Sequence, residues 1–201
     1  TWRVDEGPER HLELREVKIT TQPVAAVFDY LLTADGQFVE GRRGHFAQEV
    51  GIISIGMSTV EMLVVEDGAP VPRFTYAENL GVRRLLQLLN PDRLFSRGEM
   101  DDKLRDGEFN GQLESVLNIW GNEITGLIEE HWESGARTWE RFAGIVVVGG
   151  GAHLLRHQLT RKFRGKAHIP AEPVLAIARG LWKMGVKHEI PLVKRRARRR
   201  T

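Results

Sequence analysis

Residues 145–155 read IVVVGGGAHLL, an apolar run that ends in three glycines and continues into an apolar segment. A fully apolar run of this length is typical of a short strand buried on both faces. The glycines leave no side chain where backbone would approach a ligand, and the amino terminus of a following helix favours negative charge. Open α/β sheets bind ligands at the carboxyl ends of their strands, which is where these glycines are expected. Candidate binding residues are therefore Gly149, Gly150, Gly151 and Ala152, with a close strand–helix turn as the structural alternative.

A second glycine turn lies in residues 52–61, IISIGMSTVE. It joins an almost entirely apolar strand, expected at 50–56, to a second strand expected at 60–66. Glycine permits a sharp turn and a close approach of backbone to a ligand, and successive amides beside two hydroxyls form a concave site for an anion. The alternative is a tight hairpin with satisfied hydroxyls. The candidate residues here are Ser54, Gly56, Met57, Ser58 and Thr59.

The patterns on either side predict an α/β protein, a mixed sheet flanked by helices in the order β-β-β-α-(insert)-α-β-α-β-α. Further strands are expected at residues 12–20, 70–76 and 167–170, and the turn at Asp67 and Gly68 favours a hairpin. Helices are expected at 23–32, 81–89, 112–132, 153–163 and 174–184. Asn79 is a possible amino-terminal cap of the second helix, and Gly185 is expected to close the last.

Composition narrows the class of protein. The 201 residues are 41% hydrophobic and 28% charged, which excludes a disordered chain. The absence of cysteine excludes disulfides and thiolate chemistry and favours a reducing, cytoplasmic compartment. No apolar run approaches the ~18 residues of a membrane span, so no membrane partner is expected. His153 and His157 lie one helical turn apart without an acidic partner, and we expect no metal site.

Positive charge gathers at the carboxyl end. Six of the 29 lysines and arginines lie in residues 194–200, and the rest of the chain is net acidic. A run of this kind is usually a solvated, disordered end. The functional alternative is a contact with a polyanion such as DNA, although no aromatic residue interleaves with the arginines to stack on bases.

In this order, the motifs resemble those of the actin-like ATPases, most closely the plasmid-segregation actins of the ParM family. IISIGMSTVE resembles their second phosphate-binding hairpin, and IVVVGGGAHLL is similar to their adenosine motif. QPVAAVFDYLLTADG, residues 22–36, resembles the helix that precedes the hairpin, and PVLAIARGLWKMG, residues 173–185, looks like the closing helix. The resemblance covers residues 17–188, and residues 91–110 match poorly.

Such proteins have two ribonuclease H-like domains with ATP or ADP and Mg²⁺ in the cleft between them. The resemblance implies that residues 23–190 form the second domain, with an inserted subdomain at 91–110 that leans on the base. Residues 1–22 would connect to, or be a remnant of, a first domain, and 191–201 would be a disordered basic tail. The amides of Gly56, Met57 and Ser58 would meet the β- and γ-phosphates, and the three glycines would pass the α-phosphate and adenosine.

The resemblance also implies partners: self-association into filaments, acting in plasmid or DNA segregation or as a cytoskeleton, with DNA or an adaptor protein as a possible ligand of the basic tail. The alternative is a hydrolysis-impaired actin-fold scaffold or regulatory binding module. Other enzymes of the superfamily are less well supported. A sugar kinase needs a catalytic Asp that neither glycine turn offers, and a chaperone ATPase needs a further peptide-binding domain.

Two departures place ATP hydrolysis in doubt. The family's hairpin begins with an Asp that organises the water shell of Mg²⁺, whereas this chain has Ser54 there, and a neutral hydroxyl lacks the negative charge that a hard cation prefers. Glu61 keeps the hairpin's later acidic position. The first domain also has no counterpart in the sequence, so the chain is expected to be either a fragment or a naturally truncated protein, and a start other than Met favours a fragment. Because the cleft needs both domains, this chain alone is expected to bind nucleotide weakly or not at all.

Overall fold

The computed structural model describes residues 6–9, 11, 17, 19–109, 111–132 and 139–198, and of residues 188–198 only the helical backbone. Its strands form one mixed sheet with the order β3-β2-β1-β5-β6. β1 (Val50–Ile55) pairs antiparallel with β2 (Val60–Glu66) and parallel with β5 (Gly144–Val148). β6 (Ala167–His168) continues the parallel side. β3 (Ala69–Pro70) and β4 (Tyr76–Glu78) both pair with β2.

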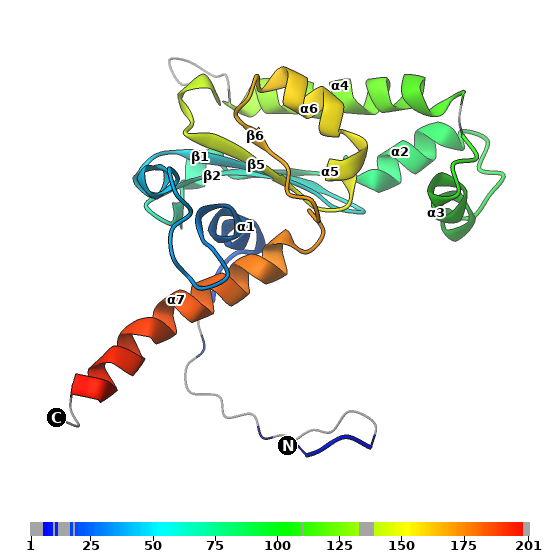
Figure 1. Ribbon diagram of the computed structural model, residues 1–201. Coiled ribbons are helices and arrows are strands. Elements are labelled where there is room, and N and C mark those ends of the chain that lie inside the picture. The colour runs from blue at the N-terminus through cyan, green and yellow to red at the C-terminus, as the bar shows by residue number, and fades with distance from the viewer. Residues whose placement is uncertain are drawn as a thin grey trace.

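Helices cover both faces of this sheet (Figure 1). One face carries α2 (Val82–Leu89), α4 (Leu113–Trp132), α5 (Gly151–Leu154) and α6 (Arg156–Lys162). The other face carries α1 (Gln22–Leu31) and α7 (Ala176–Arg198). α3 (Arg97–Arg105) lies beyond α2, and short 3₁₀ turns occur at Arg43–Ala47, Pro72–Phe74 and Trp139–Arg141.

The strand residues alternate between two cores. Ile53 and Ile55 pack under α2 and α4, whereas Val50 and Ile52 pack against α1. Because β1 is buried on both faces, its sequence is apolar throughout except for Ser54. The predicted fold class, an α/β mixed sheet flanked by helices, is confirmed.

α1 and α7 pack closely along one seam. A Cβ added to Gly180 would lie 1.8 Å from the carbonyl oxygen of Ala25, so only glycine fits there. Beside this contact, the carboxylate of Asp29 accepts from Arg179 at 2.8 Å and lies 2.7 Å from the Lys183 ammonium. Burial raises the pKa of Asp29, but the two cations outweigh it and hold that pKa below its usual value.

Three predictions about individual strands and helices are wrong. The strand expected at 70–76 is broken into β3, a 3₁₀ turn that begins at Pro72, and β4, because proline has no N–H for a sheet ladder. Asn79 does not cap α2, whose cap residue is Gly81 with no side-chain hydrogen bond. The helix expected at 153–163 is divided at Leu155 into α5 and α6. The hairpin turn is confirmed, since Asp67 and Gly68 have φ of 50° and 74°.

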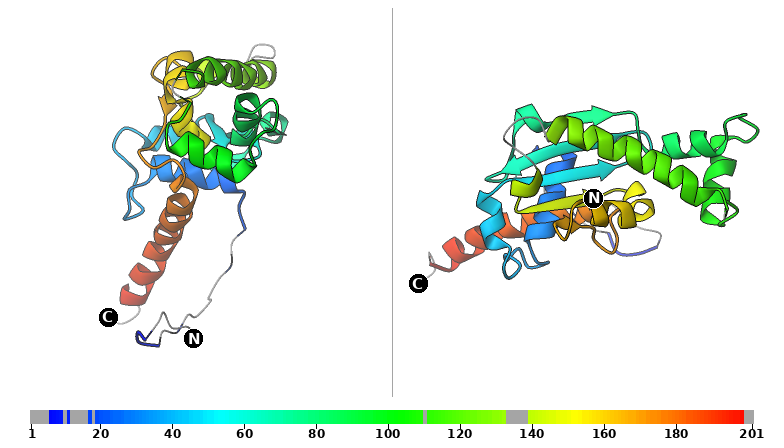
Figure 2. Two further views of the ribbon diagram at one scale, coloured as in Figure 1. Left: turned by 90° about the vertical axis from the view of Figure 1, so that its right-hand side faces the viewer. Right: turned by 90° about the horizontal axis from the view of Figure 1, so that it is seen from above.

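The end of the last helix also differs from the prediction. α7 passes through Gly185 and continues to Arg198, projecting away from the sheet (Figure 2). Gly185 is not among the glycines with positive φ, so it does not adopt the left-handed conformation that ends a helix. Residues 191–198 of the expected disordered tail are therefore helical in backbone. Residues 199–201 and most of the strand expected at 12–20 lie outside the described residues, and the proposed division into domains stays a prediction.

Candidate functional site

The turn between β1 and β2, residues 56–59, is bound by its carbonyl groups to the start of α2. The amide of Gly81 donates to Ser58 at 3.2 Å, that of Val82 to Gly56 at 2.9 Å and that of Arg83 to Met57 at 2.7 Å. These bonds satisfy the first amides of α2, which is why no side-chain cap is needed. A Cβ at Gly81 would lie 2.6 Å from the Gly56 oxygen, so the contact requires glycine.

The amides of this β1–β2 turn are left available. Gly56 N–H donates to the Thr59 carbonyl at 2.9 Å, whereas no backbone acceptor within the described ranges is recorded for the amides of Met57, Ser58 and Thr59. Successive N–H groups of this kind attract an anion. The Ser58 hydroxyl accepts from the Arg83 guanidinium at 2.8 Å, which brings a positive charge to the turn.

The glycine turn, residues 149–151, lies directly beside the β1–β2 turn, because Ser54 is in register with Val148 across the parallel strands. Gly149 has φ of 88°, and a Cβ there would lie 2.4 Å from the Ile55 carbonyl oxygen. Gly151 is equally close, since its Cβ would meet the Ile55 side chain at 2.2 Å. The structure thus brings together the two turns that the sequence singled out.

A cavity of about 350 Å³ opens between these turns and α3. Its lining residues come from both turns, from α2, α3 and α5, and from the segment before α7; they are Met57, Val82, Asp101, Leu104, Arg105, Gly150, His153, Leu154 and Val174. Of the candidate binding residues from the two turns, Met57 and Gly150 line it, and so does His153, which the sequence analysis considered only as a metal ligand. The α3 residues belong to the segment 91–110 that the resemblance places against the base, but the sequence analysis predicted no helix there and singled out none of these lining residues. The capping box of Ser96 and Glu99 is the signal that could have revealed this helix.

Ser54 and Glu61 lie opposite each other on neighbouring strands. By strand alternation they share the face covered by α1 and α7. The Mg²⁺ that the resemblance implies prefers carboxylate and carbonyl oxygens. In the described part of the chain no group of three or more His, Cys, Asp or Glu side chains is placed to hold a metal ion. A serine and one glutamate do not fit Mg²⁺ by themselves.

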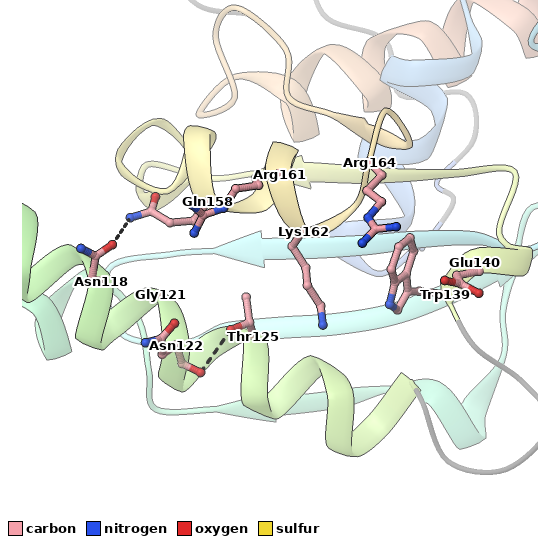
Figure 3. A pocket seen from close by; sticks show the side chains of 10 residues that line it. All are labelled: Asn118, Gly121, Asn122, Thr125, Trp139, Glu140, Gln158, Arg161, Lys162 and Arg164. Atoms are coloured by element: carbon pink, nitrogen blue, oxygen red, sulfur yellow. Dashed lines mark hydrogen bonds between the residues drawn. The ribbon is translucent and has the colours of Figure 1, made fainter.

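A second cavity, of about 390 Å³, lies between α4 and α6 and shares no residue with the first (Figure 3). It is lined largely by polar side chains: Asn118, Gly121, Asn122, Thr125, Trp139, Glu140, Gln158, Arg161, Lys162 and Arg164. Lys162 forms an ion pair with Glu129. A groove between two helix surfaces leaves no motif in the sequence, and sequence reasoning did not find this one.

Comparison with known proteins identifies the fold. No protein-family model and no curated protein matches the sequence. The apo psk41 ParM protein matches with a TM-score of 0.68 at 15% identity, over 87% of this chain and 49% of that one. An archaeal actin homologue in complex with ADP matches with a TM-score of 0.64 at 18% sequence identity, over 84% of this chain and 57% of that one. The ParM protein of a 15-stranded filament from Clostridium botulinum matches with a TM-score of 0.64 at 18% sequence identity, over 92% of this chain and 58% of that one.

The chain therefore has the fold of the actin-like ATPases, and it spans about half the length of the solved structures that it matches. Within that fold the ParM proteins and the archaeal actin homologue are among its neighbours, as the sequence motifs predicted. None of the described helices is both long enough and apolar enough to cross a membrane.

Proposed function

We propose that this chain is the nucleotide-binding half of an actin-like protein and that it binds ATP or ADP where the two turns meet. The observation that carries the proposal is the close contact of Gly149 with the Ile55 carbonyl. This contact places the glycine turn that follows β5 beside the available amides of the β1–β2 turn. The ADP complex of the archaeal actin homologue supports it by fold.

Each part of the site has a distinct task. The amides of Met57, Ser58 and Thr59 donate to phosphate oxygens, because an anion is the natural partner of successive N–H groups. Gly149, Gly150 and Gly151 let the α-phosphate and sugar pass close to backbone, and Ala152 lies in the first turn of α5. The cavity between Gly150 and α3 receives the base, whose apolar faces pack on side chains such as Leu104 and Leu154.

Assembly into filaments is the activity that the ParM and Alp12 filament neighbours favour for the complete protein. A role of such filaments in DNA segregation or as a cytoskeleton is what the resemblance of the motifs implies. The basic residues 194–200 would then contact DNA or an adaptor. The second candidate is a scaffold or regulatory module that binds nucleotide without hydrolysing it. Ser54 favours this second candidate, because the position beside the phosphates offers no carboxylate.

Nuclear magnetic resonance with ADP at millimolar concentration tests the site, since half a site binds weakly. We expect ADP to shift the amide resonances of residues 57–59 and 149–151. A Cβ at Gly150 meets no atom of the described structure within 4 Å, so we expect Gly150→Phe to be tolerated by the backbone while its ring obstructs the cavity, which unfolding of the variant checks. Gly126→Phe is the matched control, since a Cβ at Gly126 also meets no atom within 4 Å and α4, on which it lies, contributes no residue to the cavity lining.

The proposal predicts that Gly150→Phe abolishes the ADP shifts and that Gly126→Phe preserves them. Absence of shifts in the unsubstituted chain, or equal shifts in both variants, would contradict nucleotide binding at this site. Assembly is a separate question, which sedimentation of the chain with and without ATP addresses: filaments should pellet, and a scaffold should stay in solution.

A further inference from the structure

We propose that Arg83 gives the β1–β2 turn a cationic charge of its own, so that this turn binds a phosphate chain without a divalent cation. The inference rests on the proposed function of the turn and concerns the state of the ligand that it takes: the free polyphosphate anion rather than its metal complex.

Arg83 is tied to the turn at two points. Its backbone amide donates to the Met57 carbonyl at 2.7 Å, and its guanidinium donates to the Ser58 hydroxyl at 2.8 Å. The Nε atom of Arg83 is buried and has no hydrogen-bond partner in the described structure. The recorded polar contacts of this residue are thus all to the β1–β2 turn.

The neighbouring arginine shows the contrast. Arg84 forms a two-pronged ion pair with Glu123, with distances of 3.0 and 2.6 Å, which neutralises its charge. No carboxylate is recorded as a partner of Arg83 in the described ranges. Its positive charge is therefore uncompensated beside three available amides, and charge-assisted hydrogen bonds to phosphate are stronger than neutral ones.

None of the acidic groups near the turn is recorded in contact with Arg83 in the described structure. Glu78, opposite Val60 at the start of β2, accepts instead from the Tyr76 hydroxyl and the Asn79 amide. Asp101, at the cavity, is paired with Arg105 at 2.9 Å. Ser54 is neutral at the position where the resemblance expects an Asp, which leaves Glu61 as the carboxylate opposite it. A guanidinium repels a divalent cation and attracts a polyphosphate, so Arg83 and Ser54 change the electrostatics of the turn in the same direction.

Inorganic tripolyphosphate is the probe, because it isolates the phosphate site from the base cavity. Its binding is followed by the amide shifts of residues 57–59, once with EDTA and once with excess Mg²⁺. We expect the unsubstituted chain to bind at least as tightly in EDTA. Arg83→Gln should weaken binding about tenfold, the effect of about 1.4 kcal/mol, and the matched control Arg84→Gln should change it less than twofold.

Two further variants protect the test. Arg83→Lys keeps the positive charge and should retain most of the affinity for tripolyphosphate. This variant tests the role of the charge at position 83 if Arg83→Gln does not fold. Ser54→Asp adds a negative charge and should weaken binding in EDTA and make Mg²⁺ stimulate it. Equal affinities of Arg83→Gln and Arg84→Gln, or binding by the unsubstituted chain only with Mg²⁺, would overturn the inference.

The outcomes separate the inference from the proposed function. If ADP shifts the glycine turn but tripolyphosphate in EDTA does not bind, the inference is wrong and nucleotide binding stands. If tripolyphosphate binds in EDTA through Arg83 and ADP does not bind, the metal-free anion site stands and the proposed nucleotide site is wrong. If neither ligand binds, both are wrong.

Discussion

Replacing Gly149 with alanine tests whether the glycine turn is held against β1. An L-residue in the left-handed region costs about 1–2 kcal/mol, and the φ of Gly149 is 88°. The new Cβ would also lie 2.4 Å from the Ile55 carbonyl oxygen, and β1 cannot move away because it is paired on both sides. Overpacking of this kind costs about 1–3 kcal/mol. The two effects together predict a loss of about 2–5 kcal/mol of unfolding free energy.

Gly150→Ala is the matched control in the same turn. Gly150 has φ of −61° and ψ of −36°, already helical, and an added Cβ meets no atom of the described structure within 4 Å. Alanine should therefore be neutral or stabilise by about 0.4–1 kcal/mol. Thermal unfolding should show Gly149→Ala lower by roughly 4–20 °C for a chain of this size, with Gly150→Ala unchanged or higher. Equal melting temperatures of the two variants would refute the packing argument.

Four further outcomes are expected. The Gly180→Ala variant should unfold at a markedly lower urea concentration, because the new Cβ would lie 1.8 Å from the Ala25 carbonyl oxygen. Gly185→Ala should instead stabilise α7 by up to about 1 kcal/mol, because Gly185 lies within the helix. A destabilised Gly185→Ala variant would argue against a helix that continues through this residue. The lowered pKa of Asp29 stabilises the fold above about pH 4 and this contribution is lost as pH falls through the folded-state value, so Asp29→Asn should flatten the acid limb of a pH–stability curve. If residues 194–200 contact DNA, the slope of log K against log salt should reach about −5, and a chain ending at Val193 should lose that binding and keep its melting temperature.

Burial on both faces made the centre of the fold predictable. β1 and β5 are apolar runs because they have a core on each side, and such runs stand out in a sequence. The glycine turns were also predictable from local sequence, because the composition changes abruptly from apolar residues to glycine where each strand ends. The contact between the two turns could not be predicted from the sequence of either segment. It follows from the parallel register of Ser54 with Val148, which only the assembled sheet defines.

The wrong predictions depend on contacts distant in the sequence or on backbone angles. The cap of α2 is supplied by carbonyls of the β1–β2 turn, which no inspection of residues 79–82 reveals. Gly185 was expected to end a helix, yet glycine in a helix interior costs only about 1 kcal/mol, and the residue type does not disclose the sign of φ. The α3 side chains that line the cavity are too polar to show a helical stripe.

The central place of β1 has a consequence for synthesis of the protein. Its antiparallel partner β2 follows at once, so a hairpin can form as soon as both strands leave the ribosome. Its parallel partner β5 is not complete until Val148 has been added. Throughout that interval one edge of β1 carries unpaired N–H and C=O groups, and such an edge invites pairing with other chains. Slow translation between β2 and β5 should therefore increase co-translational aggregation, and a chaperone that shields this edge should relieve it.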